Sequence, residues 1–444
     1  MKKFLQIHTL TSYPASLLNR DDAGFAKRIP FGGVTRTRIS SQCLKRHWRT
    51  FAGTGGLHEI GVPASLRSRI TFQECVLKPL VDKYHVDDEL AGVLTAGLQA
   101  IVLGGKKKAD DSDGGTESGG KGGKKGAKKA AKKKSESGGD DEADLSAAES
   151  NSHTIADVAK SSTGKTDQVT VIGPAEIEYV LAEAVRLATE FKTADAARKG
   201  LETITKAKEH KEWIKNLAAI SSGLDAALFG RMITGDVLAT MNAAVHVAHA
   251  FTVHAEQSEP DYFSAVDELL ESSGGDARGS GHINTAELTS GLYYGYVAVD
   301  VNLLRENVIG MRKPDGSHPE DTAVREVLRR LVGLIATVTP GAKLGATAPH
   351  ARAQLVLLEA GNAQPRTLAN AFLAPVEAGR SDPNLLDHTC SSMSAHVSEL
   401  DGMYPGEFER RWAGAGINKA LTDTLGATQR GSVPALQEFA ATVV

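Results

Sequence analysis

The chain has 444 residues, which is long enough for two or three globular units at roughly 100 to 200 residues each. Its longest apolar stretches, such as 331–338, fall far short of the about 20 residues that cross a bilayer, which excludes a membrane-spanning helix. The formal net charge of -3 argues against a nucleic-acid ligand when it is averaged over the whole chain. The distribution of the charge therefore matters more than its sum.

The first residues do not form a secretory signal, because Gln6 and His8 interrupt the apolar run and no small-residue cleavage site follows. The three cysteines are odd in number, far apart and without C-x-x-C spacing, which argues against a disulfide framework and a zinc site. We therefore expect a cytoplasmic protein with reduced thiols and no cofactor. These cysteines are Cys43, Cys75 and Cys390.

Residues 3–11 alternate with the two-residue period of a strand, which we expect to be the first strand of the core. Ser40 and Ser41 stand where N-cap hydroxyls begin a helix. The expected buried stripe of that helix is formed by Leu44, Trp48 and Phe51.

Helical spacing dominates residues 63–103 and returns over 174–217, which predicts a helical lobe. Between them, residues 104–150 are rich in Gly, Ser, Lys and Asp and contain too little apolar surface to fold. We expect this insertion to be disordered. A loose electrostatic contact with DNA is the alternative role for its lysine runs.

Residues 243–255 are rich in Ala, as helices are, but Val245, Val247 and Phe251 fit a strand, which we favour. A Gly-, Ser- and Asp-rich arm follows over 256–289, and an aromatic strand over 291–301. The pattern predicts an arm that leaves a sheet and returns to it.

We expect a further helix over residues 321–338, which Pro340 stops. Mixed segments complete the core from there to residue 444. No internal repeat is visible.

A cationic segment near the amino terminus is the strongest candidate site. It contains no Asp or Glu between residue 23 and Glu59, whereas an ordinary solvated surface mixes both signs. Gly32 and Gly33 permit a close backbone approach, and the helix start at Ser40 presents free N–H groups that suit phosphate. These features favour a sugar-phosphate ligand held without base reading, and a merely solvated basic helix is the alternative. The seven cations are Lys27, Arg28, Arg36, Arg38, Lys45, Arg46 and Arg49.

Two other groups of residues could bind metal ions by their residue types. Asp21 and Asp22 are the only paired carboxylates beside the basic segment, and nucleases that use two metal ions need such groups. His246, His249 and His254 lack metal-ligand spacing, so we expect them to be ordinary histidines whose hydrogen bonds are satisfied within the protein.

The run LQIHTLTSYPASLLNRDDAGFAKRIPFGGVTRTRISSQCLKRHWR closely resembles the amino terminus of the CasC family, the backbone subunits of the type I-E CRISPR complex Cascade. The resemblance continues in order through ALFGRM, VHVAHAFTVH, PDYFSAVDEL, GLYYGYVAVDVNLL, TPGAKLGA and RTLANAF. It covers most of the chain, except the Lys-rich tract and the residues from there to about 214.

The resemblance implies an α+β protein shaped like a right hand. Its palm has an RRM-like, ferredoxin-like fold and comprises residues 1–54, 220–255 and 290–444. A helical finger lobe spans 55–219, and a protruding thumb spans 256–289.

The resemblance also implies a function without catalysis. Several copies line up along one crRNA, the palm holds the RNA backbone, and each thumb displaces one base at regular intervals. The remaining bases then pair with target DNA. The implied partners are crRNA, target DNA, copies of the chain itself and the other Cascade subunits, namely the large subunit, the small subunit and the guide-end subunits, with no membrane.

Site residues follow by position from the resemblance. The resemblance implies contacts with the sugar-phosphate backbone of the RNA by Arg20, Ser40, Ser41, Lys45, Arg46 and Arg49. It also implies that Met232 lies against the bases. We add Lys27, Arg36, Arg38 and Lys343 as RNA-binding candidates. Asp21 and Asp22 belong to the CasC-like N-R-D-D string, yet related backbone subunits of type III complexes cut RNA with a loop Asp. A metal-dependent RNA endonuclease is therefore the alternative function.

The thumb candidates are Tyr262 and Phe263, expected at its tip, where a ring beside a splayed base contributes about 1 to 3 kcal/mol. The family has Trp where this chain has Tyr262, which weakens the wedge. Alternatively both rings pack the base of the arm, and the helical spacing of Phe263, Val266 and Leu270 then buries Phe263.

A second basic surface lies in the expected finger lobe, where the family uses lysines to contact target DNA. Glu202, Glu209 and Glu212 intervene, so an exposed helix of mixed charge is the alternative. The lysines are Lys206, Lys208, Lys211 and Lys215.

Overall fold

The structure is a computed structural model. It describes residues 2–103, 164–166, 169–204, 208–220, 223–231, 241–266, 280–310, 320–377, 384–416 and 419–444. The insertion over 104–150 and the candidates Lys206 and Met232 lie outside these ranges, so the expectations for them stay predictions. Among the described helices, none is long and apolar enough to span a bilayer.

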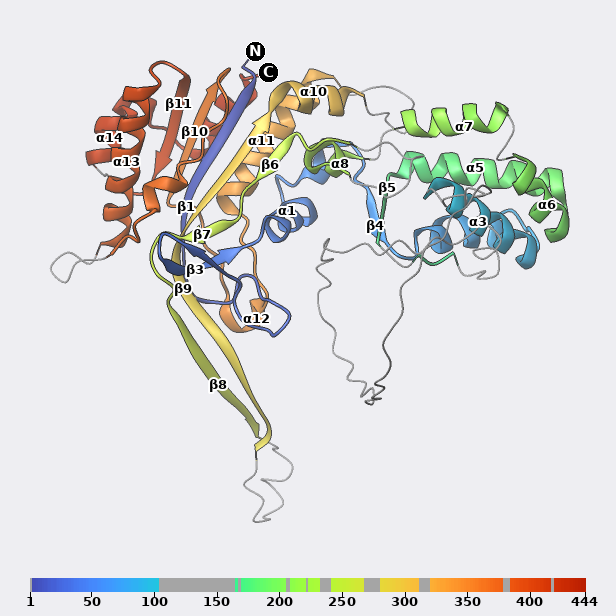
Figure 1. Ribbon diagram of the computed structural model, residues 1–444, viewed down its shortest axis with the longest axis horizontal. Coiled ribbons are helices and arrows are strands. Elements are labelled where there is room, and N and C mark those ends of the chain that lie inside the picture. The colour runs from blue at the N-terminus through green and yellow to red at the C-terminus, as the bar shows by residue number, and fades with distance from the viewer. Residues whose placement is uncertain are drawn as a thin grey trace, which may run out of the picture.

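A nine-stranded antiparallel sheet forms the centre of the molecule, with the strand order β11-β10-β1-β9-β7-β3-β2 and with β6 and β8 also paired to β9 (Figure 1). The predicted first strand is confirmed as β1 and runs on to Ser16. The bounds of the strands are β1 Phe4–Ser16, β2 Arg28–Phe31, β3 Val34–Ile39, β6 Val245–Val247, β7 Ala250–Thr252, β8 Ser258–Val266, β9 Ser280–Asp300, β10 Leu355–Gly361 and β11 Phe408–Gly414.

The strand predicted over 243–255 is present as two short pieces, β6 and β7, which both pair with β9. The aromatic strand is longer than expected, because β9 begins at Ser280 instead of Gly291. Two long-range pairings therefore organise this region: β9 with β1 inside the sheet, and β9 with β8 in the arm.

One face of the sheet packs against the helix that follows the basic segment and against four other helices. Leu5 and Ile7 of β1 lie in a core with Trp48 of the first of these helices and Leu328 of a long one. The helices on this face are α1 Ser41–Thr50, α8 Leu224–Phe229, α10 Val301–Ile309, α11 Asp321–Thr337 and α15 Val433–Ala441. The helix predicted to stop before Pro340 is thus confirmed as α11, with Val338 as its C-cap.

The opposite face is covered by α13 Leu385–Met403 and α14 Lys419–Leu425, with the short turn η3 Ala369–Phe372 beside them. Leu10, Tyr294 and Phe372 belong to this second core. Because β1 is buried on both sides, its alternation does not separate apolar from polar side chains. Gln6 and His8 point into the second layer and are fully buried there.

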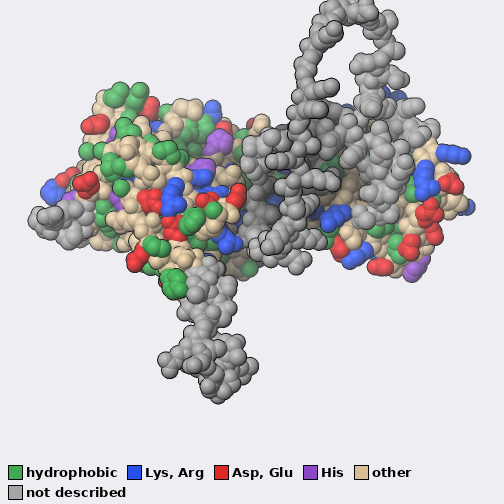
Figure 2. All heavy atoms as spheres, turned by 60° about the horizontal axis from the view of Figure 1, so that its bottom comes forward, with side chains coloured by type: hydrophobic (Ala, Val, Ile, Leu, Met, Phe, Trp, Pro, Cys, Tyr) green, Lys and Arg blue, Asp and Glu red, His purple; other side chains and the backbone are tan. Residues whose placement is uncertain are grey.

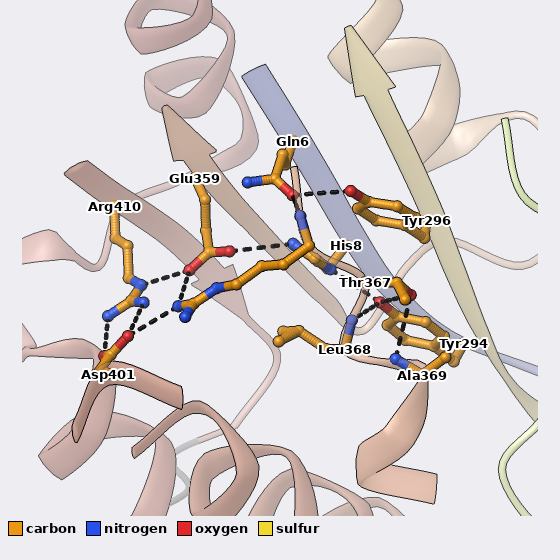
Figure 3. Close-up of polar contacts among 11 residues, drawn as sticks. Gln6, His8, Tyr294, Tyr296, Glu359, Thr367, Leu368, Ala369, Asp401 and Arg410 are labelled. Carbon is orange, nitrogen blue, oxygen red and sulfur yellow. Dashed lines mark hydrogen bonds and ion pairs between the residues drawn. The ribbon is translucent and has the colours of Figure 1, made fainter. Parts of the chain in front are cut away.

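A buried polar network connects the sheet to α13 (Figure 3). Glu359 of β10 accepts from Arg410 Nε at 2.7 Å and from Arg366 Nη2 at 3.2 Å, and its other oxygen lies 3.5 Å from His8 Nε2. Both arginines also donate to Asp401 of α13. Burial favours the neutral acid, but His8, Arg410 and Arg366 outweigh it and lower the pKa of Glu359 to about 2.

The helical lobe has a core of its own and stands at one side of the sheet, next to α1 and α8 (Figure 1). A two-stranded ribbon of β4 and β5 lies between the lobe and the part of the chain that contains the sheet (Figure 1). The central helix α3 is buried along most of its length. The elements are β4 Leu66–Ser68, η2 Gln73–Leu77, α2 Lys78–Asp82, α3 Asp88–Val102, β5 Thr170–Ile172, α5 Pro174–Phe191, α6 Ala194–Ile204 and α7 Lys208–Ala219, and the remaining short turns are η1 Leu57–Ile60, α12 Leu344–Thr347 and η4 Ala427–Gln429.

An arm formed by β8 and the first part of β9 projects from the sheet (Figure 1). The helical spacing that we read in Phe263, Val266 and Leu270 is wrong for the described part, because β8 is an extended strand through Val266. Pairing with β9 outweighs the local spacing, as cross-strand contacts commonly do.

We expect Glu359→Gln to lower the free energy of unfolding at pH 7 by about 3 kcal/mol, because it leaves two buried arginines undercompensated. The folded pKa lies below the unfolded value of about 4.3, so this stabilisation is present above pH 4.3 and is lost as the pH falls toward 2. Denaturant unfolding of both proteins at pH 7 and pH 3 measures it. The difference in the free energy of unfolding between wild type and Glu359→Gln is expected to be about half as large at pH 3 as at pH 7. An equal gap at both pH values contradicts the assignment.

Candidate nucleic-acid interface

Ser40 is the N-cap of α1, as predicted, and its role is structural. Its Oγ accepts from Cys43 N at 3.2 Å, and its own N–H donates to Asn19 Oδ1 at 2.8 Å. Only 2% of Ser40 is exposed, so the hydroxyl caps the helix inside the protein. Ser41 is half-buried and donates to Gln42 Oε1 at 3.2 Å.

The N-R-D-D string builds a tight loop in front of β2. Asp21 Oδ1 accepts from the N–H groups of Ala23 at 3.0 Å and Phe25 at 2.9 Å. The half-buried Arg20 pairs with Ala26 through its backbone, as an isolated antiparallel β-bridge. Asp22 is exposed. Within the described part of the chain, no three or more His, Cys, Asp or Glu side chains come together as a metal site would require.

The outer face of α1 holds a cluster that we call the junction cluster, formed by Lys45, Arg46 and Arg49 together with Arg67 of β4 and Asp225 of α8. Asp225 Oδ2 accepts from Arg67 Nη2 at 3.2 Å and lies 3.8 Å from Arg49 Nη1. Lys45 Nζ lies 5.7 Å from the centre of the Phe229 ring. The three cations of α1 were predicted from the sequence, whereas Arg67 and Asp225 were not.

The cations of the junction cluster are close enough to repel one another. Burial, and then the charge of Arg67, lower the pKa of Lys45. For Arg49, burial and the charges of Arg67 and Arg46 lower the pKa, and Asp225 opposes them only in part. A bound anion relieves this repulsion, which suits the phosphate groups of a nucleic acid.

Arg36 is fully buried, which corrects its prediction as an RNA contact. Its guanidinium donates to the carbonyl oxygens of Phe31 at 3.2 Å, Thr252 at 3.0 Å and Phe372 at 2.9 Å. It thus ties the β2–β3 hairpin to β7 and η3. The backbone of Gly32 closely approaches the backbone carbonyl of Leu373 in the same chain, so a Cβ at Gly32 would collide with the Leu373 oxygen.

Arg38 is half-buried, and its Nη1 donates to His249 Nδ1 at 2.9 Å. Burial, and then the charges of Arg38 and Lys27, lower the pKa of His249, which keeps the ring a neutral acceptor. The other two histidines have backbone partners instead, since His246 Nε2 lies 3.0 Å from Ala243 O and His254 Nδ1 lies 2.7 Å from Ala255 O. The three are hydrogen-bonded, as predicted.

Acidic side chains reach the basic segment from the base of the arm. Arg28 pairs with Glu256 at 2.5 Å and also with Glu287, and Glu287 accepts from Ala26 N at 2.6 Å. The segment that contains no acid in sequence is therefore partly neutralised in space. The excess of positive charge is retained on α1, farther along the chain. Figure 2 shows Lys, Arg and His side chains interspersed with acidic ones on the face that carries the arm.

The remaining candidates are spread over three places. Tyr262 is 65% exposed and pairs with Thr285 across the arm, and Phe263 pairs with Asn284, so both lie along the arm and not at its tip. Lys343 is half-buried at the start of α12. The three described finger lysines, Lys208, Lys211 and Lys215, are exposed on α7.

We expect Arg36→Lys to destabilise the protein by about 2 to 3 kcal/mol, because one ammonium cannot replace a planar fork that serves three buried carbonyls. Thermal unfolding measures this. Arg46→Gln is the matched control on the exposed side of α1 and is expected to change stability by less than about 0.5 kcal/mol. Equal stability of Arg36→Lys and wild type would remove the structural role.

Comparison with known proteins places this geometry in context. A chain of a solved "CRISPR RNA-guided surveillance complex, pre-nicking" is 25% identical with a TM-score of 0.66, and the match covers 99% of this chain and 100% of that one. A chain of another CRISPR RNA-guided surveillance complex is 20% identical with a TM-score of 0.52 over 99% and 98%, which shows a shared fold. No curated protein matches. The model of the CT1975-like protein family matches residues 5–441, and the chain belongs to that family.

Proposed function

We propose that the protein is a crRNA-binding backbone subunit of a CRISPR surveillance complex, several copies of which bind side by side along one guide. The observation that carries the proposal is the excess of cations over carboxylates on the outer face of α1. The family membership and the full-length similarity to a chain of a CRISPR RNA-guided surveillance complex support it.

The junction cluster suits a ligand whose sequence varies. Lys and Arg side chains neutralise phosphates whatever the bases are, so they fix the position of the strand and carry no sequence information. A guide held in this way leaves its base edges free to pair with target DNA, and base pairing then supplies the specificity.

An RRM-like palm is part of this proposal. In chain order, β1, α1, β6, β9, α11 and β10 alternate as in a βαββαβ unit, and their order in the sheet is β10-β1-β9-β6. Both helices pack on the same face. This arrangement supports a ferredoxin-like unit, in which each helix connects two strands separated by a third.

The arm is proposed as the thumb. Its described part is a two-stranded antiparallel extension of the sheet, and Tyr262 presents a largely exposed ring on it. Such a ring is available to stack on a displaced base, which is tolerant of sequence because every base has a π-face.

We further propose that the complex is of type I-E, that it works in the cytoplasm, and that its other members are the large, small and guide-end subunits. The CasC-like run over residues 5–49 supports the type. Lys208, Lys211 and Lys215 are exposed on α7 and are proposed to contact target DNA.

We expect replacement of Lys45, Arg46 and Arg49 by Gln to weaken RNA binding equally for guides of scrambled spacer sequence. For a single strand, three lost phosphate contacts make the negative slope of log K against log salt shallower by about 2. Filter binding across a salt series measures both. A variant with Arg305, Arg325 and Lys419 replaced by Gln loses the same charge outside the cluster and is expected to bind like wild type. A strong preference for one spacer sequence would contradict the proposal.

We propose that the protein has no reaction of its own. The side chains of Asp21 and Asp22 are both exposed, and Asp21 Oδ1 accepts two backbone N–H groups within the loop, which gives this carboxylate a structural role and leaves Asp22 as the candidate to test. The assembled complex, incubated with Mg²⁺ and labelled RNA complementary to the guide, is therefore expected to leave that RNA intact. Gel electrophoresis is the readout. Cleavage that disappears in Asp22→Ala would establish the endonuclease alternative instead.

A further inference from the structure

Asp225 lies where the palm and the helical lobe meet. It belongs to α8, and its carboxylate contacts Ser65 and Arg67 of the lobe and Arg49 of the palm helix α1. Only 1% of the residue is exposed. A buried carboxylate at such a place is expensive unless its partners compensate it, so its surroundings are informative.

The two oxygens of Asp225 serve different partners. Oδ1 accepts from the N–H of Ser65 at 2.7 Å and from its hydroxyl at 2.5 Å, which fixes the carboxylate against the chain that leads into β4. Oδ2 faces the arginines and accepts from Arg67 Nε at 3.3 Å and Nη2 at 3.2 Å, with Arg49 Nη1 at 3.8 Å. One oxygen therefore anchors the group, and the other aligns two guanidinium groups from different lobes.

The charges of this cluster do not balance. Among the described residues, Asp225 is the carboxylate that pairs with Arg49 and Arg67, and Lys45 lies one turn before Arg49 on the same helix. Arg67 is close enough for its charge to act on both Lys45 and Arg49. Three cations, Lys45, Arg49 and Arg67, with one carboxylate leave this part of the junction positive.

Arg67 has access to a ligand and Asp225 does not. The Arg67 side chain is 36% exposed and that of Arg49 is 18% exposed, whereas Asp225 is covered. A guanidinium already held on one edge loses less side-chain freedom when its other edge binds a phosphate. The carboxylate behind the arginines thus orients them without occupying the site that a ligand reaches.

We infer that Arg67 is a further phosphate contact for single-stranded RNA and that Asp225 is the positioning residue that holds Arg67 and Arg49 side by side for it. This inference rests on the proposed function, because the guide phosphates are the ligand. It adds the helical lobe to the RNA-binding surface, so that palm and lobe hold the same stretch of backbone.

The test uses the full chain and a fluorescent single-stranded RNA of scrambled sequence, titrated at several salt concentrations. Arg67→Gln is expected to weaken binding about 3- to 10-fold. It is also expected to make the negative slope of log K against log salt shallower by about 0.7, the value for one lost contact. Asp225→Asn keeps the shape of the side chain and is expected to weaken binding as well, although it makes the cluster more positive.

A double variant separates positioning from general stability. If Asp225 acts through Arg67, the Arg67→Gln and Asp225→Asn double variant loses less affinity than the product of the two single losses. Asp401→Asn is the matched control, because Asp401 is also one carboxylate shared by two arginines, Arg366 and Arg410, but on the other side of the sheet. It is expected to lower the thermal midpoint and to leave RNA affinity unchanged.

Two results would overturn the inference while leaving the proposed function in place: wild-type affinity and salt slope in Arg67→Gln, or tighter binding in Asp225→Asn, which would mean that the carboxylate competes with RNA. If Asp225→Asn does not fold, the Arg67→Gln titration decides alone. Absence of RNA binding by the wild-type chain would instead remove the proposed function, and this inference with it.

Discussion

The antiparallel pairing of β1 with β9 is the constraint on which the other parts of the molecule depend. The two strands pair from Phe4 opposite Asp300 to Ser16 opposite Thr289. At Thr289 the strand changes partner, because the same residue pairs with Ser258 of the arm, and its hydroxyl donates to Ser16 O at 2.8 Å. The arm is therefore a continuation of a central strand of the sheet, and the twist and direction of the sheet determine where it points.

Burial of β1 on both faces determines what its neighbours must supply. The apolar face is covered by α1 and α11, which brings the cations of α1 to the outside of the same layer. On the other face, the buried carboxylate Glu359 requires compensation that Arg410 and Arg366 provide from the β11 and η3 side. A buried ionic group of this kind contributes little net stability when complete but is costly to break, so it favours one arrangement of α13 over others.

The local parts of the fold could be predicted from the sequence, and the long-range parts could not. The alternation in β1, the cap at Ser40 and the end of α11 before Pro340 depend on neighbouring residues and were correct. The strand β8 was misread in part, because its conformation depends on β9. Burial of Arg36 was missed for the same reason, since the carbonyls that hold it come from residues 252 and 372.

The charge of the candidate site shows the same limit more sharply. A run of seven cations without an acid predicts one continuous positive surface, but Glu256 and Glu287 enter from the arm and neutralise Arg28. Asp225 enters from α8, and Arg67 replaces part of the lost positive charge from β4. Positive charge is thereby concentrated at the junction of the two lobes, where the cations repel one another and a bound anion would lower that repulsion.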